Sequence, residues 1–567
     1  MSYAMVGNES TIADRSLPVT RFFVLFIFAF LLSFSQIAYS IALSTMPDVS
    51  HAAGSIITAS TNTRPNVLLI MCDDLNDYSG AFGGHHQVRT PNIDKLAKSG
   101  VVFANAQSNC PVCSPSRNSL FTGVYTHRSG DFEWTPHDKQ PVLKNCKTLM
   151  EYFRENGYTV LGSGKLLHHN RKNLWDEWGV EINNYGPFAF DGNDLVGHPS
   201  VPEPFRSIGA VDGSFAPLSD VPAFPKSTGP GKPGWIYSWD KKRYLNYIDA
   251  NNRDLTPDEM HAEWAVRKIK ELERRNDHKP FFMGIGFVRP HTPLYAPKRF
   301  FDMFPIEEIE LSPIKEGDAE DCYYTSVYPL TRKGPRYYRL LRESYPDIET
   351  GLKNFLQAYL ACIAFVDEQI GAVLDALNDS KFRDNTIVVF TSDHGWNIGE
   401  KEYLFKNSPW EESTRIPLII RAPGRTRPGS TVDHPVSLID IFPTLTDLCR
   451  LKGDTRKNNA GARPDGFSLG PFLREPEFQN WNGPEGALTV LGVGQNKKDV
   501  LKQNYAYRTR DWRYILYQNG EEELYDHRND PYEWNNLAGD ERYAEKKQKL
   551  KNQMLNIIKK DLETIEK

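Results

Sequence analysis

Val67-Leu-Leu-Ile-Met71 is an uninterrupted run of apolar residues, and Asp73 and Asp74 follow it almost directly. A short run without polar alternation is typical of a strand buried on both faces of a parallel sheet. Ligands of such sheets bind beyond the carboxyl ends of the strands, which is where these two aspartates are expected. The stretch therefore predicts an α/β fold with polar chemistry at one edge of its sheet.

From about residue 64 the chain alternates strand and helix patterns. Apolar runs predict further strands at residues 158–161, 281–287 and 386–390. Helices are predicted at residues 92–99 and 149–153, after the capping box Thr256–Glu259, and at residues 356–377. This alternation predicts a large, mostly parallel sheet between helices.

Two stretches, residues 186–240 and 305–350, are rich in Pro, Gly or aromatic residues and have no clear period. Because long irregular loops are usually functional or disordered, we expect them to wall the active site. Beyond about residue 480, Tyr-rich runs, an Asn519-Gly520 hairpin signal and a charged final helix predict a different layout. We expect a catalytic α/β domain over residues 64–479 and an antiparallel-sheet plus helix subdomain over residues 480–567.

The N-terminus carries an apolar run, Phe22 to Leu32, preceded by Arg15 and Arg21. The run is shorter than the roughly 20 apolar residues that a spanning helix needs. We interpret residues 1–42 as an export signal peptide and residues 43–63 as a linker, with an uncleaved N-terminal anchor as the alternative. An exported protein without a stable membrane span after signal cleavage is expected.

Composition narrows the function classes. The 567 residues include 67 Lys and Arg against 72 Asp and Glu, a net charge of −5, and no basic tail, which disfavours a nucleic-acid binder. The seven cysteines form an odd set in an exported chain. Cys110 and Cys113 have CxxC spacing, but neither a second CxxC nor a thioredoxin-like pattern accompanies them.

Each of the other three predicted strands is also followed by chemistry-bearing residues. These are Lys165, His168 and His169 after residues 158–161, Arg289 and His291 after residues 281–287, and Asp393 and His394 after residues 386–390. Carboxylates from two strand ends suit Ca²⁺ or Mg²⁺, while a histidine ligand leaves Mn²⁺ or Zn²⁺ open. The alternative for two aspartates after a strand is a helix cap or a solvated turn.

Arg117, Lys165 and Lys406 would form a cationic pocket with the histidines. Such a pocket favours a sulfate or phosphate ester and stabilises the charge that develops during group transfer. The alternative interpretation is that each of these residues is an ordinary cation on the protein surface.

The segment from Cys113 to Gly123, CSPSRNSLFTG, resembles the signature of the type I sulfatase family. That signature reads C-x-P-S-R, three residues, an apolar residue, Thr and Gly, and Phe121 stands where Leu or Met is usual. The resemblance runs from about residue 64 to residue 540. It implies an α/β, alkaline-phosphatase-like sulfatase fold, with a large mostly parallel sheet between helices and a smaller C-terminal α+β subdomain.

In that family the signature cysteine is oxidised to Cα-formylglycine before folding is complete, which makes a formylglycine-generating enzyme a partner during maturation. The resemblance implies one Ca²⁺ per chain, with Mg²⁺ or Mn²⁺ as alternatives. Its implied ligands are Asp73, Asp74, residue 113, Asp393 and His394. Six cysteines then remain, so disulfides among them stay open.

The implied mechanism starts from the hydrated aldehyde, a geminal diol that the metal and Arg117 help to ionise. Its oxygen attacks sulfur while Lys165 and Lys406 neutralise the sulfate oxygens. His291 protonates the leaving alcohol. His168 then takes a proton from the second hydroxyl, and sulfate is expelled.

Within the family the chain looks most like the iduronate-2-sulfatase branch. Asp393-His394, Lys165-Leu-Leu-His168 and Arg289-Pro-His-Thr-Pro293 match that branch, although His169 offers a second histidine beside His168. The branch implies a sulfated saccharide substrate, such as a glycosaminoglycan, without fixing the sugar. The alternatives are a phosphodiesterase or phosphonate monoester hydrolase of the same superfamily, and a catalytically dead exported glycan-binding protein.

Overall fold

The structure is a computed structural model that describes residues 64–169, 171–182, 184–222, 224, 232–275, 278–327, 331–492 and 499–565. The predicted signal peptide and linker, residues 1–42 and 43–63, lie outside the described residues. No helix among the described residues has the length and apolar character needed to cross a membrane.

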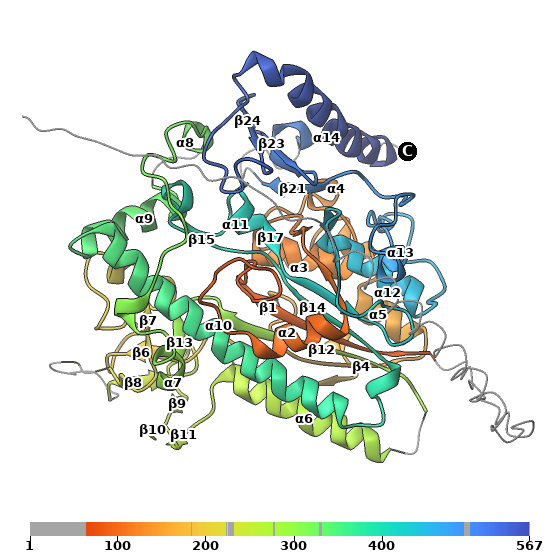
Figure 1. The fold of residues 1–567 in the computed structure, drawn as a ribbon. Coiled ribbons are helices and arrows are strands. Elements are labelled where there is room, and N and C mark those ends of the chain that lie inside the picture. Colours follow the sequence, from red (N-terminus) through yellow and green to blue (C-terminus); the bar gives the residue numbers. More distant parts are fainter. Residues whose placement is uncertain are drawn as a thin grey trace, which may run out of the picture. The chain divides into compact units, whose positions relative to one another are not determined.

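An eight-stranded sheet forms the centre of the fold, in the order β19-β2-β18-β14-β1-β12-β4-β5 (Figure 1). β1 (Asn66–Asp73) runs parallel to β12 (Phe281–Pro290) and β14 (Thr386–Ser392), and β4 (Thr159–Gly164) runs parallel to β12. The strands beyond these four are β5 (Glu177–Trp178), β18 (Leu418–Arg421), β2 (Val101–Phe103) and β19 (Ser430–Val432). β18 is antiparallel to both of its neighbours, so the sheet is mostly parallel, as predicted.

Helices cover both faces of the sheet. Successive side chains of β1 point to opposite faces, so each face carries apolar side chains that must be buried. Leu68 and Ile70 belong to one apolar cluster, whereas Leu69 and Met71 belong to another. The first cluster contains residues of α2 (Pro91–Ser99), α6 (Pro257–Arg274) and α10 (Ile348–Asn378), and the second of α3 (Cys113–Thr122), α5 (Leu149–Glu155) and α12 (Ile441–Leu448). Each large apolar side chain buried this way contributes about 1.5–3 kcal/mol.

The predicted helix starts are confirmed where a local capping pattern exists. Thr256 and Glu259 form the capping box at the start of α6, in which Glu259 accepts hydrogen bonds from the Thr256 backbone and hydroxyl. α10 begins at Ile348, earlier than residue 356, because Asp347 caps it by accepting from the Thr350 backbone N–H at 2.7 Å.

The irregular stretches contain more regular structure than the sequence indicates. Residues 305–350 include α9 (Lys333–Ser344), a helix whose buried side is Tyr337, Leu340 and Leu341. The sequence does not predict this helix, because a Gly-Pro pair in its first turn and many charged residues interrupt the apolar pattern. Residues 186–240 supply the short strands β6 (Phe188–Phe190), β7 (Phe215–Pro217) and β8 (Gly234–Ile236).

The C-terminal part carries a separate antiparallel sheet and the final helix α14 (Ala544–Ile565), drawn in blue in Figure 1. The strands are β21 (Ala487–Leu491), β22 (Asn504–Arg508), β23 (Trp512–Leu516) and β24 (Glu522–Asp526). Gly520, at φ 90°, closes the predicted hairpin by donating its N–H to the Tyr517 carbonyl at 3.0 Å. Buried Arg513 ties this sheet to the rest of the fold through Glu411 and Glu533.

Shorter elements complete the described chain. They are the helices α4 (Thr126–Ser129), α7 (Lys298–Phe301), α8 (Tyr324–Val327), α11 (Glu411–Thr414) and α13 (Gly470–Arg474), and the strands β3 (Ala106–Gln107), β9 (Tyr244–Leu245), β10 (Tyr247–Asp249), β11 (Asn252–Arg253), β13 (Leu294–Ala296), β15 (Asn397–Ile398), β16 (Leu404–Phe405), β17 (Arg415–Ile416) and β20 (Val436–Ser437).

Candidate active site

Cys113 is the first residue of α3 and is fully buried. Every residue of α3 is buried, and Gly123, at φ 72°, ends the helix by donating its N–H to the Ser119 carbonyl at 2.7 Å. A helix N-terminus carries a partial positive charge and favours negative charge beside it. The position of Cys113 therefore suits chemistry on an anionic group.

Three other side chains meet at this cysteine. Asp73, Asp74, Cys113 and His394 each offer one ligand atom, and these atoms lie within 4.8 Å of one another. His394 Nε2 lies 3.3 Å from Cys113 Sγ, and His394 Nδ1 lies 3.4 Å from Asp74 Oδ1. The predicted convergence of the ends of β1 and β14 with the signature segment is thus observed.

Asp393 lies beside this cluster rather than in it. Its Oδ2 accepts a hydrogen bond from Arg117 Nε at 2.8 Å, and its Oδ1 accepts from the Asp74 backbone N–H at 3.2 Å. Its carbonyl oxygen also accepts from the hydroxyls of Ser108 and Ser116 at 2.7 Å each. These contacts fix the end of β14 against α3.

Arg117 is committed to groups of the protein on every side. Besides Asp393 it approaches Asp73, with Nη2 3.2 Å from Oδ1, and it donates to the carbonyls of Cys72 and Lys165. Burial alone would lower the pKa of Arg117, but Asp393 and Asp73 raise it above its ordinary value. Arg117 therefore holds two carboxylates in place as a fixed, fully buried cation.

Lys165 and Lys406 contact one aspartate each. Lys165 Nζ pairs with Asp73 Oδ2, whereas Lys406 Nζ lies 2.7 Å from Asp74 Oδ1 and 3.2 Å from Cys113 Sγ. Although burial alone would lower the pKa of both lysines, the aspartates raise it, so both stay charged. The Lys406 ammonium therefore lies directly beside Cys113, and the Lys165 ammonium lies beside Asp73 of the same cluster.

Two glycines make room for Lys165 where β4 and β12 end. A Cβ on Gly164, which has φ +84°, would lie 1.9 Å from the Gly286 carbonyl oxygen, and a Cβ on Gly286 would lie 2.2 Å from the Lys165 backbone. The Lys165 N–H in turn donates to the Gly286 carbonyl at 2.7 Å. This close approach aims the lysine at the end of β1.

His291 lies at the cluster, whereas His168 lies farther out. His291 Nε2 is 3.6 Å from Asp74 Oδ2, and its Nδ1 donates to the Thr292 carbonyl. Burial, with Lys406, holds the pKa of His291 well below its ordinary value. Within the described residues, no hydrogen bond or ion pair joins His168 to the cluster; its ring packs on the exposed Trp134 at 4.5 Å, and burial with Lys165 lowers its pKa to about 3.

The surroundings shift the pKa values of Asp73 and Asp74 in opposite directions. Lys165, His291 and Arg117 outweigh burial and hold the pKa of Asp73 well below its ordinary value. Burial, together with Asp73, raises the pKa of Asp74 well above its ordinary value despite Lys406. Two carboxylates this close disfavour a second negative charge unless a cation lies between them.

The donor set fits a divalent cation. Asp73 Oδ1 is buried and accepts no hydrogen bond from the described residues, and its charged neighbour there is Arg117, with Nη2 at 3.2 Å. Carboxylate oxygens suit Ca²⁺, Mg²⁺ or Mn²⁺, and the imidazole of His394 is compatible with Mn²⁺. Asp73, Asp74 and His394 would hold the ion, with residue 113 facing it.

Two residues that no sequence pattern indicates also lie beside the site. Tyr185 lies over Lys165, with its ring centroid 4.4 Å from Nζ, and packs against His291 at 4.8 Å. Asp212 accepts a hydrogen bond from the Thr292 hydroxyl at 2.8 Å, beside His291. Both residues come from irregular sequence without a periodic signal, so only the tertiary structure shows their place.

The cysteines carry no cross-links. All seven are free thiols in the structure, so the disulfides left open by the sequence are not formed. Cys110 is fully buried, and burial raises its pKa far above the ordinary value. A redox role for the Cys110–Cys113 spacing gains no support from these surroundings.

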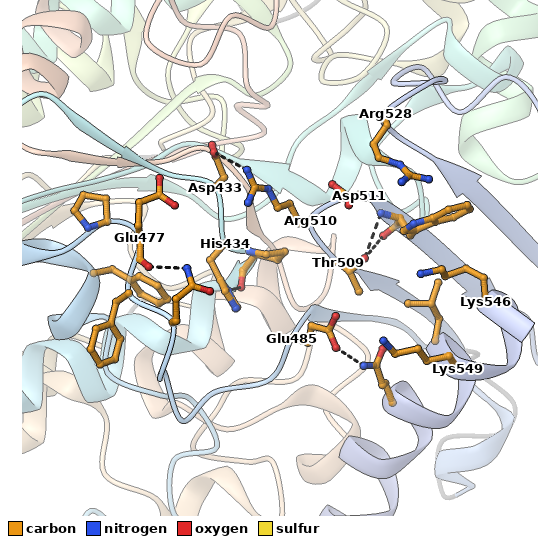
Figure 2. Close-up of a pocket in the computed structure, with 18 residues that line it drawn as sticks. Asp433, His434, Glu477, Glu485, Thr509, Arg510, Asp511, Arg528, Lys546 and Lys549 are labelled. Atoms are coloured by element: carbon orange, nitrogen blue, oxygen red, sulfur yellow. Dashed lines mark hydrogen bonds and ion pairs between the residues drawn. The ribbon is translucent and has the colours of Figure 1, made fainter.

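A separate hollow of about 410 Å³ lies between the C-terminal helix and neighbouring loops (Figure 2). His434, Phe472, Arg510, Trp512, Lys546 and Lys549 are among its lining residues. Figure 2 shows acidic and basic side chains side by side in it, including the ion pair between Asp433 and Arg510 at 3.5 Å. None of the predicted site residues is among those lining it.

The site and fold match a known family. The family model described as Sulfatase matches residues 65–451, and the model described as N-sulphoglucosamine sulphohydrolase, C-terminal, matches residues 399–560. The chain therefore belongs to the sulfatase family, whose members hydrolyse sulfate esters. The family membership predicted from the signature at Cys113 is therefore confirmed.

Curated relatives cover most of the chain. A protein named Sulfatase from Formosa agariphila is 32% identical over 500 residues, which is 86% of each chain. Iduronate 2-sulfatase of Mus musculus is 28% identical over 512 residues, covering 80% of this chain and 84% of its own. The second match agrees with the resemblance to the iduronate-2-sulfatase branch.

Solved structures confirm the fold. A structure with its substrate D-glucosamine-2-N,6-O-disulfate bound has a TM-score of 0.61 at 22% identity and covers 88% of this chain and 99% of its own. The phosphonate monoester hydrolase of Agrobacterium radiobacter has the same TM-score and identity and covers 88% and 96%. The alkaline-phosphatase-like sulfatase fold expected from the sequence is thus the one observed.

Proposed function

We propose that this chain is an exported sulfatase that releases inorganic sulfate from a sulfated saccharide. The observation that carries the proposal is the convergence of Lys406 Nζ and His394 Nε2 on Cys113 Sγ, at 3.2 and 3.3 Å. A formylglycine at position 113 would place its diol oxygens in this same position. The sulfated-saccharide substrate is supported by the relatives, and export by the N-terminal signal pattern.

One divalent cation, Ca²⁺ by preference, would be held by Asp73, Asp74 and His394, with Asp393 alongside. When bound, it supplies positive charge that eases ionisation of a hydroxyl at position 113. Arg117 fixes the carboxylates on the protein side. The formylglycine-generating enzyme is the maturation partner that this chemistry requires.

In the transfer step the ionised diol oxygen attacks sulfur, and the bond between sulfur and the ester oxygen breaks. Lys165 and Lys406 neutralise the sulfate oxygens as charge moves onto the leaving oxygen. His291 is the proton donor to the departing alcohol. Its pKa lies well below the ordinary value and Nδ1 holds the proton of the neutral ring, so Nε2 must first take up the proton that the ionising hydroxyl at position 113 releases. The Nδ1 hydrogen bond to the Thr292 carbonyl keeps the imidazole oriented with Nε2 facing Asp74.

In the release step the second hydroxyl gives its proton to His168, the carbon–oxygen bond to sulfate breaks, and the aldehyde returns. Water then rehydrates the aldehyde to the diol. A base in this step must be neutral, and the low pKa of His168, about 3, keeps it neutral at ordinary pH while making it a weak base. His169 has its Nε2 bonded to the Trp134 carbonyl at 2.7 Å and is the weaker candidate.

The test is sulfate release by protein co-produced with a formylglycine-generating enzyme, with the aldehyde verified by peptide mass. The panel contains sulfated uronic-acid and algal oligosaccharides with a phosphodiester and a phosphonate monoester beside them. Release of sulfate from a saccharide supports the proposal. Faster cleavage of the phosphorus esters would instead favour the second candidate, to which the structural similarity to a phosphonate monoester hydrolase points.

An unconverted Cys113 in protein from the native host would favour the remaining alternative, a catalytically dead glycan-binding protein. The complete set of buried charged groups around Cys113 argues against that alternative. Such groups are costly to bury without a use.

A further inference from the structure

Lys333 is a half-exposed cation near the candidate site. Its Nζ lies 2.9 Å from Asp212 Oδ2, and 56% of its side chain is exposed, against 12% for Asp212. Asp212 also accepts hydrogen bonds at 2.8 Å from the Tyr337 hydroxyl and from the Thr292 hydroxyl. The carboxylate thus has hydrogen-bond partners on both oxygens without Lys333.

Two independent routes connect Lys333 to the reacting centre. Through Asp212 it reaches Thr292, whose carbonyl holds His291. Through Phe405 it reaches Lys406, because Lys333 Nζ lies 4.7 Å and Lys406 Nζ 5.7 Å from the centroid of that one ring. Lys333 therefore lies one side chain away from both His291 and Lys406.

The ammonium group of Lys333 keeps donors available. An ammonium has three N–H groups, and the described hydrogen bonds of Lys333 use one of them, to Asp212. The ammonium also lies over two aromatic rings, with Nζ 4.7 Å from the centroid of Phe405 and 5.8 Å from that of Tyr337. A cation held on two rings with donors to spare is preorganised for an anion.

We propose that Lys333 binds a second anionic substituent, a sulfate or carboxylate, on the sugar that carries the scissile sulfate ester. This inference rests on the proposed function and narrows its substrate class to saccharides with two anionic groups close together. Asp212 is the positioning residue that holds the ammonium in place.

The experiment compares matched substrate pairs. One pair is glucuronate 2-sulfate and glucose 2-sulfate, and the other is glucosamine 2-N,6-O-disulfate and N-acetylglucosamine 6-sulfate. Lys333→Met keeps the apolar stem over Phe405 and removes the charge. Lys549→Met, a lysine that lines the hollow of Figure 2, is the matched control.

The wild-type protein should prefer the dianionic member of at least one pair. Lys333→Met should lower kcat/KM for that member, mainly through KM, about tenfold more than for its partner, as expected for losing one charge-assisted hydrogen bond. Lys333→Arg should restore most of the preference. The pair that responds tells whether the second group is a carboxylate or a sulfate.

An equal loss for both members would assign Lys333 a structural role and overturn the inference, as would a wild-type protein without preference in either pair. If verified formylglycine protein releases sulfate from no saccharide, the proposed function itself fails. Sulfate release with an unchanged preference in Lys333→Met overturns only the role of Lys333.

Discussion

Arg117 and Asp393 are 276 positions apart in the chain, yet Arg117 Nε lies 2.8 Å from Asp393 Oδ2 with both side chains fully buried. The pair joins the signature helix α3 to the end of β14, and Arg117 also contacts Asp73 at the end of β1. The charged centre of the candidate site is therefore part of the core, so catalysis and stability are coupled at this point.

Replacing Arg117 should lower both the rate of sulfate release and the free energy of unfolding. Arg117→Met leaves the carboxylate of Asp393 buried without its cation and Asp73 with Lys165 alone, and breaking a buried pair in this way typically costs about 3–5 kcal/mol. Chemical unfolding monitored by fluorescence measures that loss, and sulfate release should fall below detection. Arg383→Met, at an exposed ion pair, is the control and should change stability by less than about 0.5 kcal/mol. An unchanged unfolding midpoint in Arg117→Met would contradict the structural role.

Replacing Cys113 should separate activity from folding. Cys113→Ala removes the group to be converted while leaving a small side chain at the start of α3, so sulfate release should vanish while the protein remains folded. Cys362→Ala, in the middle of α10, controls for removing a buried thiol and should keep most of the activity. Near-normal sulfate release by Cys113→Ala would refute the assignment of the nucleophile.

Calcium should stabilise the folded protein because it offsets the repulsion between Asp73 and Asp74. At a hundredfold excess over Kd, one bound ion adds about 2.7 kcal/mol to the free energy of unfolding. Thermal unfolding with Ca²⁺ added to chelator-treated protein measures the shift, independently of turnover. Asp74→Asn should lose this response, and Asp384→Asn, at a carboxylate that is 94% exposed, should keep it. Equal shifts in both variants would exclude this site as the source.

Asp131 should make stability depend on pH. Burial raises its pKa to about 7 against an ordinary value of 3.8, although Asn118 donates to its Oδ2 at 2.8 Å. The folded state therefore binds the proton more tightly than the unfolded state. Stability from this group is complete below pH 3.8 and is lost as pH rises towards 7, by up to about 1.4 kcal/mol per pH unit.

Asp131→Asn, which stays neutral, should remove that dependence. Between pH 5 and pH 7 it should gain about 1–3 kcal/mol of stability relative to the wild-type protein. Urea unfolding of both proteins at several pH values measures the difference, with Asp384→Asn as the exposed control. Parallel curves for Asp131→Asn and the wild-type protein would show that Asp131 is ionised in the fold.

Much of the fold could be predicted because its signals are local. The apolar run in β1, the capping box at Thr256 and the hairpin at Asn519-Gly520 each depend on neighbouring residues alone. α9 was missed because Gly334, Pro335 and charged residues interrupt its short apolar stripe, and its burial depends on distant partners.

The residues of the candidate site likewise fall into those that local sequence patterns predict and those that they do not. Asp73, Asp74 and His394 could be placed together because parallel strands end at one edge, and the signature identified Cys113. The sequence presented Arg117 as a cation for a ligand, whereas the structure commits it to Asp393 and Asp73. Tyr185, Asp212 and Lys333 lie in or beside irregular segments, and their positions depend on long-range contacts that no local pattern encodes.

The complete burial of Cys113 limits the time during which its thiol is accessible while the chain is being made. His394, which closes over the cysteine, comes 281 positions later in the chain. At about 5–20 residues per second, synthesis needs roughly 15–60 s to reach it. Under the proposed conversion of Cys113, a modifying enzyme would have that interval to reach the thiol before the surrounding residues bury it. The fraction of converted molecules in a preparation would then depend on the rate of modification relative to the rate of folding.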